Sequence, residues 1–196
     1  MPLGANKAAI MGVAGTAAAG DVVLLQTQSF TDETTVSFTS GITSTYGEYI
    51  FGFYNIAPAT DLALFIFQAN ASGESGYNET MTTTFFRAVH QEDDGQELFG
   101  YDENQHQAQG TDFQEISTYL GNGADENTAG SIHIFNPSST VYAKQFISHF
   151  SAYEGSNDER DYHVAGYFNT TAALTEFQFK MSSGNFDGKI KLWGVK

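Results

Sequence analysis

An alternation of apolar and polar side chains with a period of two is the feature that most restricts the fold of this chain. It begins at Asp21 and is cleanest in Leu174–Met181, where Phe177, Phe179 and Met181 fall on one side of an extended chain and polar residues fall on the other. Successive side chains of a strand point to opposite faces of a sheet, so this pattern predicts strands with one buried face.

The same pattern recurs in short segments along the chain. Turn residues such as Asn136-Pro137-Ser138 and Asp187-Gly188 separate many of them. About ten short strands joined by turns predict an all-β fold, either a β-sandwich or a jelly roll. The expected strands are Val22–Phe30, Thr34–Thr39, Glu48–Ile56, Leu62–Gln68, Met81–Val89, Ser131–Phe135, Val141–Phe150, Asp161–Phe168, Leu174–Met181 and Lys189–Val195.

One of these strands is apolar on both faces. In Glu48–Ile56, Tyr49, Phe51 and Phe53 share one face, and the other face also carries large apolar side chains. A strand of this kind is typical of a sheet that is covered on both sides. We therefore expect Glu48–Ile56 to be a central strand with both faces buried.

A long polar excursion, residues 91–130, interrupts the series of strands. It contains Asp93-Asp94-Gly95 and Gly121-Asn122-Gly123, and segments of this length are commonly functional or contact a partner. Within it, Asp112–Leu120 is predicted to form a short helix capped by Thr111 or Asp112.

The first residues, 1–20, differ in composition from the rest because they contain neither an aromatic nor an acidic residue. A Gly/Ala-rich segment so poor in large side chains cannot build a core, and its pattern fits a signal peptide poorly. We expect an extended assembly arm that lies against a neighbouring subunit, followed by a single domain over residues 21–196. The candidate contacts of this arm are Leu3, Lys7, Ile10 and Met11.

The charge is strongly and unevenly acidic. Eight Lys and Arg residues stand against 23 Asp and Glu residues, a formal net charge of −15, and residues 88–143 contain no basic residue. Nucleic acids and anionic membranes are bound mainly by clustered cations, so neither is an expected partner. No run of apolar residues approaches the roughly 18 needed to span a bilayer.

The motifs of common enzymes are missing from the sequence. Cysteine is absent, which excludes disulfides, thiolate metal sites and a cysteine nucleophile. Gly73-Glu74-Ser75-Gly76 is one residue short of a nucleophile elbow and is interpreted as a turn, and Gly12-Val13-Ala14-Gly15-Thr16 lacks the lysine of a phosphate-binding loop. We expect no catalytic residues and no cofactor.

The histidines and carboxylates give only weak indications of a metal. A sheet could bring His133, His149 and His163 together, but chance placement on neighbouring strands explains them better, and no metal site is assigned. Structural calcium is a further possibility, because Asp and Glu in loops supply hard oxygen ligands, although none follows EF-hand spacing. The candidate loops are Glu92-Asp93-Asp94, Asp102-Glu103-Asn104 and Asp125-Glu126-Asn127.

Exposed aromatic rings raise the question of sugar binding. Trp193 shares a strand face with Lys189 and Lys191, opposite Ile190 and Leu192, so it is predicted to be at least partly exposed. Tyr101 lies in the acidic excursion. These two rings are the candidate glycan contacts, although a subunit interface uses the same residue types.

The C-terminal part of the chain resembles small structural proteins of tailed phages of marine bacteria. The resemblance is carried by Gly166–Thr171, by Phe177–Gly188 and by Ile190–Val195, and it extends to His133–Thr140, to Phe86-Arg87 followed by His90, and to the opening MPLGAN. Trp193 stands where that family is expected to have Tyr. The resemblance implies a virion location and brings no catalytic residues.

The resulting expectation is a non-enzymatic virion protein on the exterior of a phage particle. The favoured hypothesis is a capsid decoration (cement) protein, a homotrimer whose partners are the major capsid protein and other copies of itself. The alternative is a tail-fibre or tail-tip module that recognises a host surface glycan. The head or tail position remains open at this stage, as does the role of the acidic excursion.

Overall fold

Thirteen strands joined by turns and loops form residues 21–196, the part of the chain that the structure, a computed structural model, describes. These residues contain no helix, and accordingly none that could cross a membrane. The predicted all-β class is confirmed. The strands are β1 (Val22–Glu33), β2 (Thr35–Phe38), β3 (Glu48–Pro58), β4 (Ala63–Ala71), β5 (Met81–Gln91), β6 (Glu97–Tyr101), β7 (Ala108–Gly110), β8 (Gln114–Leu120), β9 (Thr128–Phe135), β10 (Lys144–Glu154), β11 (Asp158–Phe168), β12 (Leu174–Met181) and β13 (Phe186–Val195).

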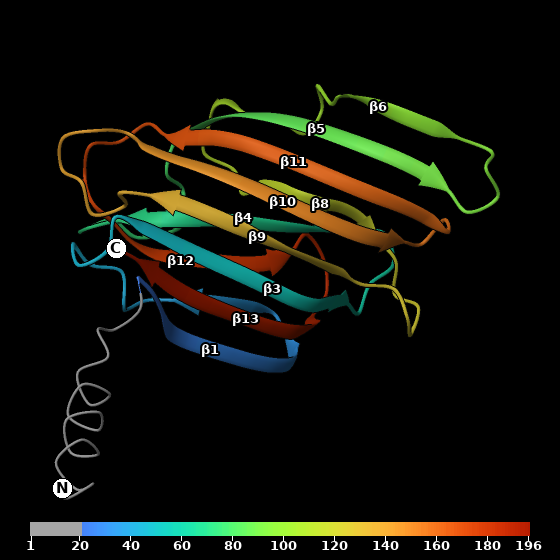
Figure 1. Cartoon of the computed structure of the whole chain (residues 1–196), viewed down its shortest axis with the longest axis horizontal. Coiled ribbons are helices and arrows are strands. Elements are labelled where there is room, and N and C mark those ends of the chain that lie inside the picture. Colours follow the sequence, from blue (N-terminus) through green and yellow to red (C-terminus); the bar gives the residue numbers. More distant parts are fainter. Residues whose placement is uncertain (1–20) are drawn as a thin grey trace, which may run out of the picture.

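The strands form two antiparallel sheets of unequal size that pack face to face (Figure 1). The nine-stranded sheet has the order β1-β13-β3-β9-β10-β11-β5-β6, with β7 also paired to β5. The four-stranded sheet has the order β2-β12-β4-β8. This arrangement is the predicted β-sandwich.

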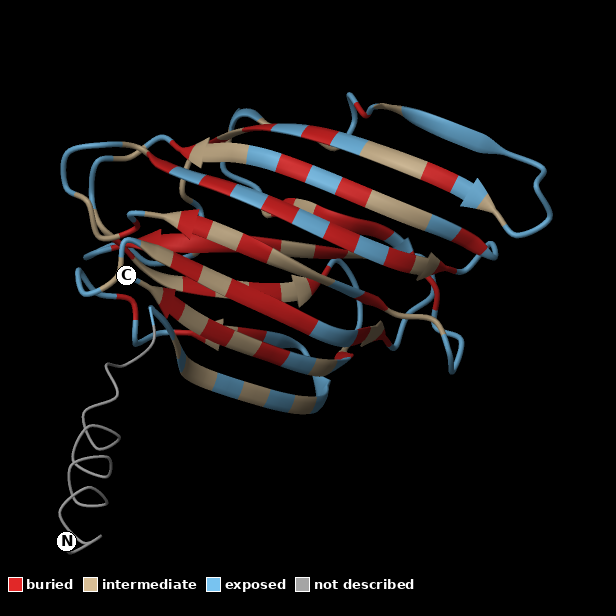
Figure 2. Ribbon diagram, viewed as in Figure 1, coloured by how far each residue is buried: buried red, intermediate tan, exposed pale blue. Residues whose placement is uncertain are grey.

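The core lies between the sheets and is dominated by phenylalanine. Along β10 buried and exposed residues alternate, as the period of a strand with one buried face requires (Figure 2). Phe179 of β12 is at the centre of the core, since its ring centroid lies 5.0–6.3 Å from five other phenylalanine rings. These rings belong to Phe38, Phe51, Phe53, Phe65 and Phe67.

The predicted helix at Asp112–Leu120 is wrong, because Gln114–Leu120 is strand β8 and pairs with β4. Ile116 and Leu120 are fully buried in the sandwich. Gln114 is also buried; its Nε2 donates to the backbone carbonyl of Gln105, and its Oε1 accepts from Thr83 Oγ1. Burial of apolar side chains in the small sheet therefore outweighs the capping pattern that favoured a helix.

The rest of the acidic excursion also joins the sheets. Strands β6 and β7 pair with β5 and extend one edge of the nine-stranded sheet. Asp102, which follows β6, forms an ion pair with Arg87 of β5 at 3.2 Å. The excursion is thus largely incorporated into the sandwich, with β6 and β7 at the edge of the large sheet and β8 in the small one.

The expectation that Glu48–Ile56 is covered on both sides is wrong. Strand β3 is central in its sheet, and Tyr49, Phe51 and Phe53 are buried against the small sheet. On the opposite face, Ile50 is only partly buried and Tyr54 is 43% exposed. No second layer among the described residues covers that side, so apolar side chains remain in contact with solvent there.

The domain boundaries stay a prediction. The proposed arm and its contacts Leu3, Lys7, Ile10 and Met11 lie outside the described residues. The described part begins at Asp21, whose backbone carbonyl accepts a hydrogen bond from Lys196, so this point of the chain adjoins the C-terminal strand.

The β10–β11 hairpin contains a buried ionic group. Glu154 and Asp158 are 2% and 1% exposed, and Nη2 of Arg160 lies 2.9 Å from Glu154 Oε2 and 3.1 Å from Asp158 Oδ2. Burial disfavours the charged carboxylate more than Arg160 favours it, which raises the pKa of Glu154 to about 7 from an ordinary value of 4.5.

This pKa predicts a pH dependence of stability that Glu154→Gln should reduce. Between 4.5, the ordinary pKa of the unfolded chain, and about 7, the pKa in the folded protein, Glu154 holds a proton in the folded state that the unfolded chain has released. The free energy of unfolding therefore falls as the pH rises through that interval. Glutamine does not titrate, so the stability of Glu154→Gln relative to the wild type should increase between about pH 5 and about pH 8.

Denaturant unfolding at several pH values measures this difference. Glu159→Gln removes a charge from an exposed position of the same hairpin and is the matched control. A stability difference between Glu154→Gln and the wild type that is the same at every pH would contradict the prediction.

Candidate functional site: the outer face of the nine-stranded sheet

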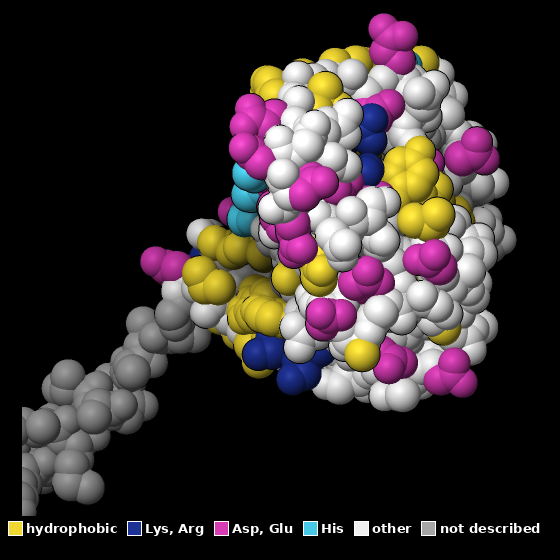
Figure 3. All heavy atoms as spheres, turned by 90° about the vertical axis from the view of Figure 1, so that its right-hand side faces the viewer, with side chains coloured by type: hydrophobic (Ala, Val, Ile, Leu, Met, Phe, Trp, Pro, Cys, Tyr) yellow, Lys and Arg dark blue, Asp and Glu magenta, His cyan; other side chains and the backbone are white. Residues whose placement is uncertain are grey.

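The face of the nine-stranded sheet that points away from the small sheet is here called the outer face. Strand register sets its chemistry, because residues paired across antiparallel strands point to the same side. One row of paired residues runs from Trp193 through Ile50, His133 and Ile147 to Ala165. Histidine and hydrophobic side chains gather with lysines along one flank in the side view (Figure 3).

A hollow of about 430 Å³ lies on this face, over strands β9, β10, β11 and β5. It arises where small side chains lie between larger ones. Its wall carries three imidazoles beside apolar groups, a combination suited to binding rather than to core packing. The lining includes Phe86, Ser131, His133, Ile147, His149 and His163.

Two of the three histidines form a compact group with an aspartate. His149 of β10 and His163 of β11 are directly paired, and their rings stack with centroids 4.2 Å apart and planes 16° apart. Nε2 of His149 lies 2.5 Å from Asp161 Oδ1, and Nε2 of His163 lies 3.0 Å from Asp161 Oδ2. Both imidazoles therefore converge on one carboxylate at the exposed surface.

His133 faces the same hollow but has a different partner. Its Nδ1 lies 2.5 Å from Oε1 of Glu48 on the neighbouring strand β3. This contact orients the ring independently of the His149–Asp161–His163 group. The structure thus brings the three predicted histidines to one face while separating them into two polar groups.

Sequence reasoning missed this group because it treated the histidines without their register. Asp161-Tyr162-His163 places a carboxylate and an imidazole on the same side of one strand. The short Gly155-Ser156-Asn157 turn between Glu154 and Asp158 then pairs His149 with His163. A tight hairpin with this spacing is the signal that would have identified the group.

Trp193 forms an aromatic platform at the other end of the outer face. It is partly exposed, as predicted, and the ring lies across Gly52, where an added Cβ would come within 2.6 Å of the ring. Lys191 Nζ lies 5.9 Å from the Trp193 ring centroid and 5.3 Å from that of Tyr54. Two aromatic rings and a cation thus share one surface.

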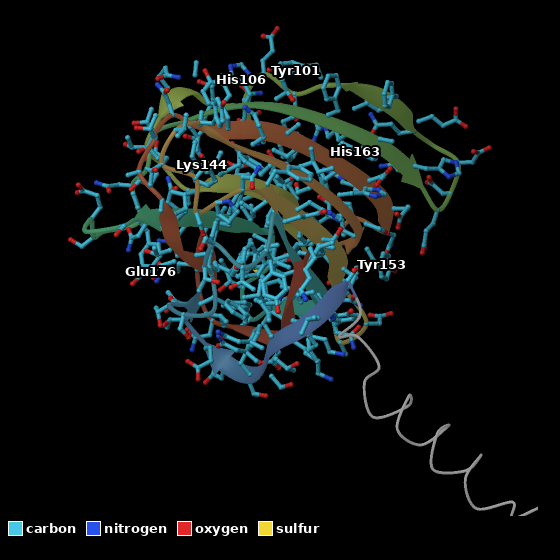
Figure 4. The ribbon with its side chains drawn as sticks, turned by 60° about the vertical axis from the view of Figure 1, so that its left-hand side comes forward. Tyr101, His106, Lys144, Tyr153, His163 and Glu176 are labelled. Atoms are coloured by element: carbon cyan, nitrogen blue, oxygen red, sulfur yellow. The ribbon has the colours of Figure 1, made fainter. Side chains whose placement is uncertain are left out.

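Tyr101 is placed far from this platform. It lies on the edge strand β6, is 44% exposed and packs edge-to-face against Phe86 with centroids 5.2 Å apart. Its ring also lies 5.6 Å from His106, its neighbour in Figure 4. The two predicted glycan contacts therefore share the outer face but do not form one site, since five strands separate β6 from β13.

In two of the loops proposed for calcium, a carboxylate group accepts a hydrogen bond from a nearby backbone N–H group. Asp93 Oδ1 accepts from the backbone N–H of Gly95, and Glu126 Oε2 accepts from that of Gly123. Within residues 21–196, the groups of His, Asp and Glu spaced closely enough to hold an ion are His149–Asp161–His163 and His90–Asp94–Glu97. None of the calcium loops predicted from the sequence forms such a group by itself.

A buried lysine lies away from the outer face. Lys144 is 1% exposed, and its Nζ donates to the backbone carbonyl of Thr170 at 3.1 Å. Burial lowers the pKa of Lys144 because the charged ammonium is poorly solvated there. It does not line the hollow, so it is interpreted as a structural group of the sandwich.

Comparison of the chain with models of known protein families, with curated proteins and with solved structures finds no match.

The Trp193 platform predicts a specific effect of Gly52→Ala. The added methyl group would occupy the space under the ring and displace it toward solvent. Trp193 is the only tryptophan, so its fluorescence reports the change directly. We expect emission at longer wavelength and stronger quenching by acrylamide.

Gly100→Ala is the matched control, because an added Cβ there meets nothing within 4 Å. It should leave the emission of Trp193 unchanged. Equal spectra for Gly52→Ala and the wild type would show that the ring does not rest on Gly52.

Proposed function

We propose that this protein is a non-enzymatic structural protein on the exterior of a phage particle, and that it acts as a capsid decoration protein. The observation that carries the proposal is the open outer face of the nine-stranded sheet. The resemblance of the sequence to phage structural proteins supplies the context.

The order of the strands supports a virion role. Eight strands divide into the sets β1-β13-β3-β9 and β2-β12-β4-β8, and the chain enters the small sheet from the large one at β2, β4, β8 and β12 and returns to the large sheet after each of these strands. We interpret this alternation as a jelly roll, an arrangement frequent in viral capsid and lectin domains. Such a fold is compatible with many functions, so the argument depends on the surface.

The remaining strands enlarge the surface beyond what the sandwich requires. Strands β10 and β11, inserted between β9 and β12, and β5 to β7, inserted between β4 and β8, widen one sheet only. The widened outer face exposes apolar side chains: Leu24 is 51% exposed, Ile147 49% and Phe86 39%. Apolar side chains spread over one face favour a protein–protein contact.

The outer face and the edge of the sheet at β6 differ in charge. Lys189 and Lys191 lie on the outer face, and neither has a carboxylate within 4.0 Å among the described residues. Six of the ten acidic residues of 88–143 lie on the edge strand β6 or in the loops before and after it, here called the acidic edge. We propose that the outer face contacts the major capsid protein while the acidic edge remains hydrated and repels other particles.

The proposed assembly includes other copies of the chain. Homotrimers are common among virion jelly rolls, and this analogy is the basis for proposing a trimer. The residues 1–20 would then supply a further contact to the shell or to a neighbouring copy.

A second candidate function is recognition of a host glycan by a tail module. It is favoured by the Trp193 platform, where an aromatic ring supported by Gly52 lies beside Lys191 and Tyr54. Flat aromatic surfaces stack on sugar rings, and an unpaired lysine would favour a sugar that carries a carboxylate or sulfate group.

The experiment for the main proposal compares two substitutions by their binding to particles that lack this protein. Ile147→Asp places a charge at the centre of the outer face, whereas Val141→Asp places one in the β9–β10 loop, where Val141 is 66% exposed. We expect Ile147→Asp to reduce occupancy more than about tenfold and Val141→Asp to leave it near that of the wild type.

Equal occupancy for the two variants would refute the outer face as the docking surface. Densitometry of purified particles separates the two virion positions, because a decoration protein is present in hundreds of copies and a tail module in far fewer. A low copy number together with binding to anionic glycans that Trp193→Ala abolishes would favour the tail module.

A further inference from the structure

We propose that His149, Asp161 and His163 form a binding site for a divalent transition-metal ion on the outer face. The proposal rests on the geometry of these side chains and holds whether or not the protein belongs to a phage particle.

The three ligand atoms already converge. One nitrogen from each imidazole and one carboxylate oxygen lie within 4.8 Å of one another. Both Nε2 atoms point at Asp161, with contacts of 2.5 and 3.0 Å. A bound ion would replace these contacts with bonds of about 2.0–2.2 Å.

The backbone holds this group in place while leaving its side chains able to adjust. His149 and His163 are paired in a regular hairpin ladder without a register shift, so the Cα positions are fixed by neighbouring hydrogen bonds. The side chains are 59%, 38% and 51% exposed for His149, Asp161 and His163. The small rotations needed to draw the two stacked imidazoles onto one ion are therefore not opposed by core packing.

The ligand set selects the class of ion. Calcium and magnesium prefer oxygen ligands, whereas imidazole nitrogen suits zinc, copper, nickel and iron. Two imidazoles and one carboxylate leave at least one coordination position free in a tetrahedral ion. That position would be open to water or to a donor atom from a molecule in the adjoining hollow.

The surroundings favour a cation in this position. The chain has a formal net charge of −15, and Asp161 makes no ion pair with a lysine or arginine within 4.0 Å among the described residues. The second group, His90–Asp94–Glu97, offers a single imidazole, and its carboxylates are more exposed than Asp161, with side-chain exposures of 59%, 82% and 79% for the three residues. It is expected to bind transition metals much more weakly.

The site would also have a structural consequence. It would join β10 to β11 through their side chains and place a Lewis acid in the middle of the outer face. A partner or ligand that docks there could complete the coordination, which would make docking dependent on the metal.

Calorimetric titration of the full-length, untagged and chelator-treated protein with Zn²⁺ tests the proposal. We expect one equivalent to bind, with affinity lowered more than about tenfold by each of His149→Gln, Asp161→Asn and His163→Gln. Co²⁺ should give visible absorption bands in the wild type that these variants lack.

His90→Gln is the matched control, because His90 is as exposed as His149 and also lies beside carboxylates. It should retain the wild-type affinity and spectrum. The proposal is overturned if the wild type binds no Zn²⁺ equivalent, or if His90→Gln lowers the affinity as much as His163→Gln does. Circular dichroism of each variant confirms that a loss of binding does not reflect unfolding.

Discussion

Aromatic side chains packed between the two sheets hold the sandwich together. Phe179 lies in the middle of β12 and contacts phenylalanine rings from β2, β3 and β4, so it joins the small sheet to the large one. Buried aromatic side chains contribute both a large apolar area and preferred edge-to-face geometries. A chain without disulfides obtains its rigidity from this core.

The same packing determines the outer face. A strand that buries every second side chain must present the intervening side chains to the other face of the sheet, and a slip by one residue would exchange the two sets. In β10, burial of Phe146 and Phe150 requires Ile147 and His149 to point outward. Packing of the core therefore fixes which residues lie on the outer face. The chemistry of that face is set by side chains that do not take part in the core.

Those residues differ in character along the face. At one end, Trp193 covers Gly52 beside Lys191, and in the middle two imidazoles meet Asp161. A surface kept only for solubility would carry charged side chains at such positions, as the acidic edge of the same domain does. This contrast within one small domain is the physical basis for assigning contact functions to the outer face.

The sequence allowed most strands to be predicted, because their period of two reflects one buried face. The bounds of β12, Leu174–Met181, agree with the prediction, and the orientation of Trp193 follows from the alternation in β13. Strand β8 could not be recognised, since its buried Gln114 pairs with the backbone carbonyl of Gln105 and the hydroxyl group of Thr83, which are distant in sequence. Likewise, the open side of β3 depends on how many layers the fold has, which alternation within one strand does not reveal.

The His149–Asp161–His163 group illustrates the remaining limit of pattern reasoning. Each residue is unremarkable by itself, and proximity arises from the exact pairing of two strands. Such pairing is set by the turn and by the core on the far side of the sheet. The chemistry of this surface is thus determined by strand register more than by any contiguous motif.

If the protein docks on a particle as proposed, the outer face is open in the isolated domain and covered in the assembled particle. Hydroxyl-radical footprinting, read by mass spectrometry at Trp193, Tyr54 and Ile147 in free and particle-bound protein, measures this directly. We expect strong protection of all three side chains on the particle, with Val141 and Tyr142 in the β9–β10 loop labelled equally in both states. Equal labelling of the outer face in the free and bound protein would contradict it.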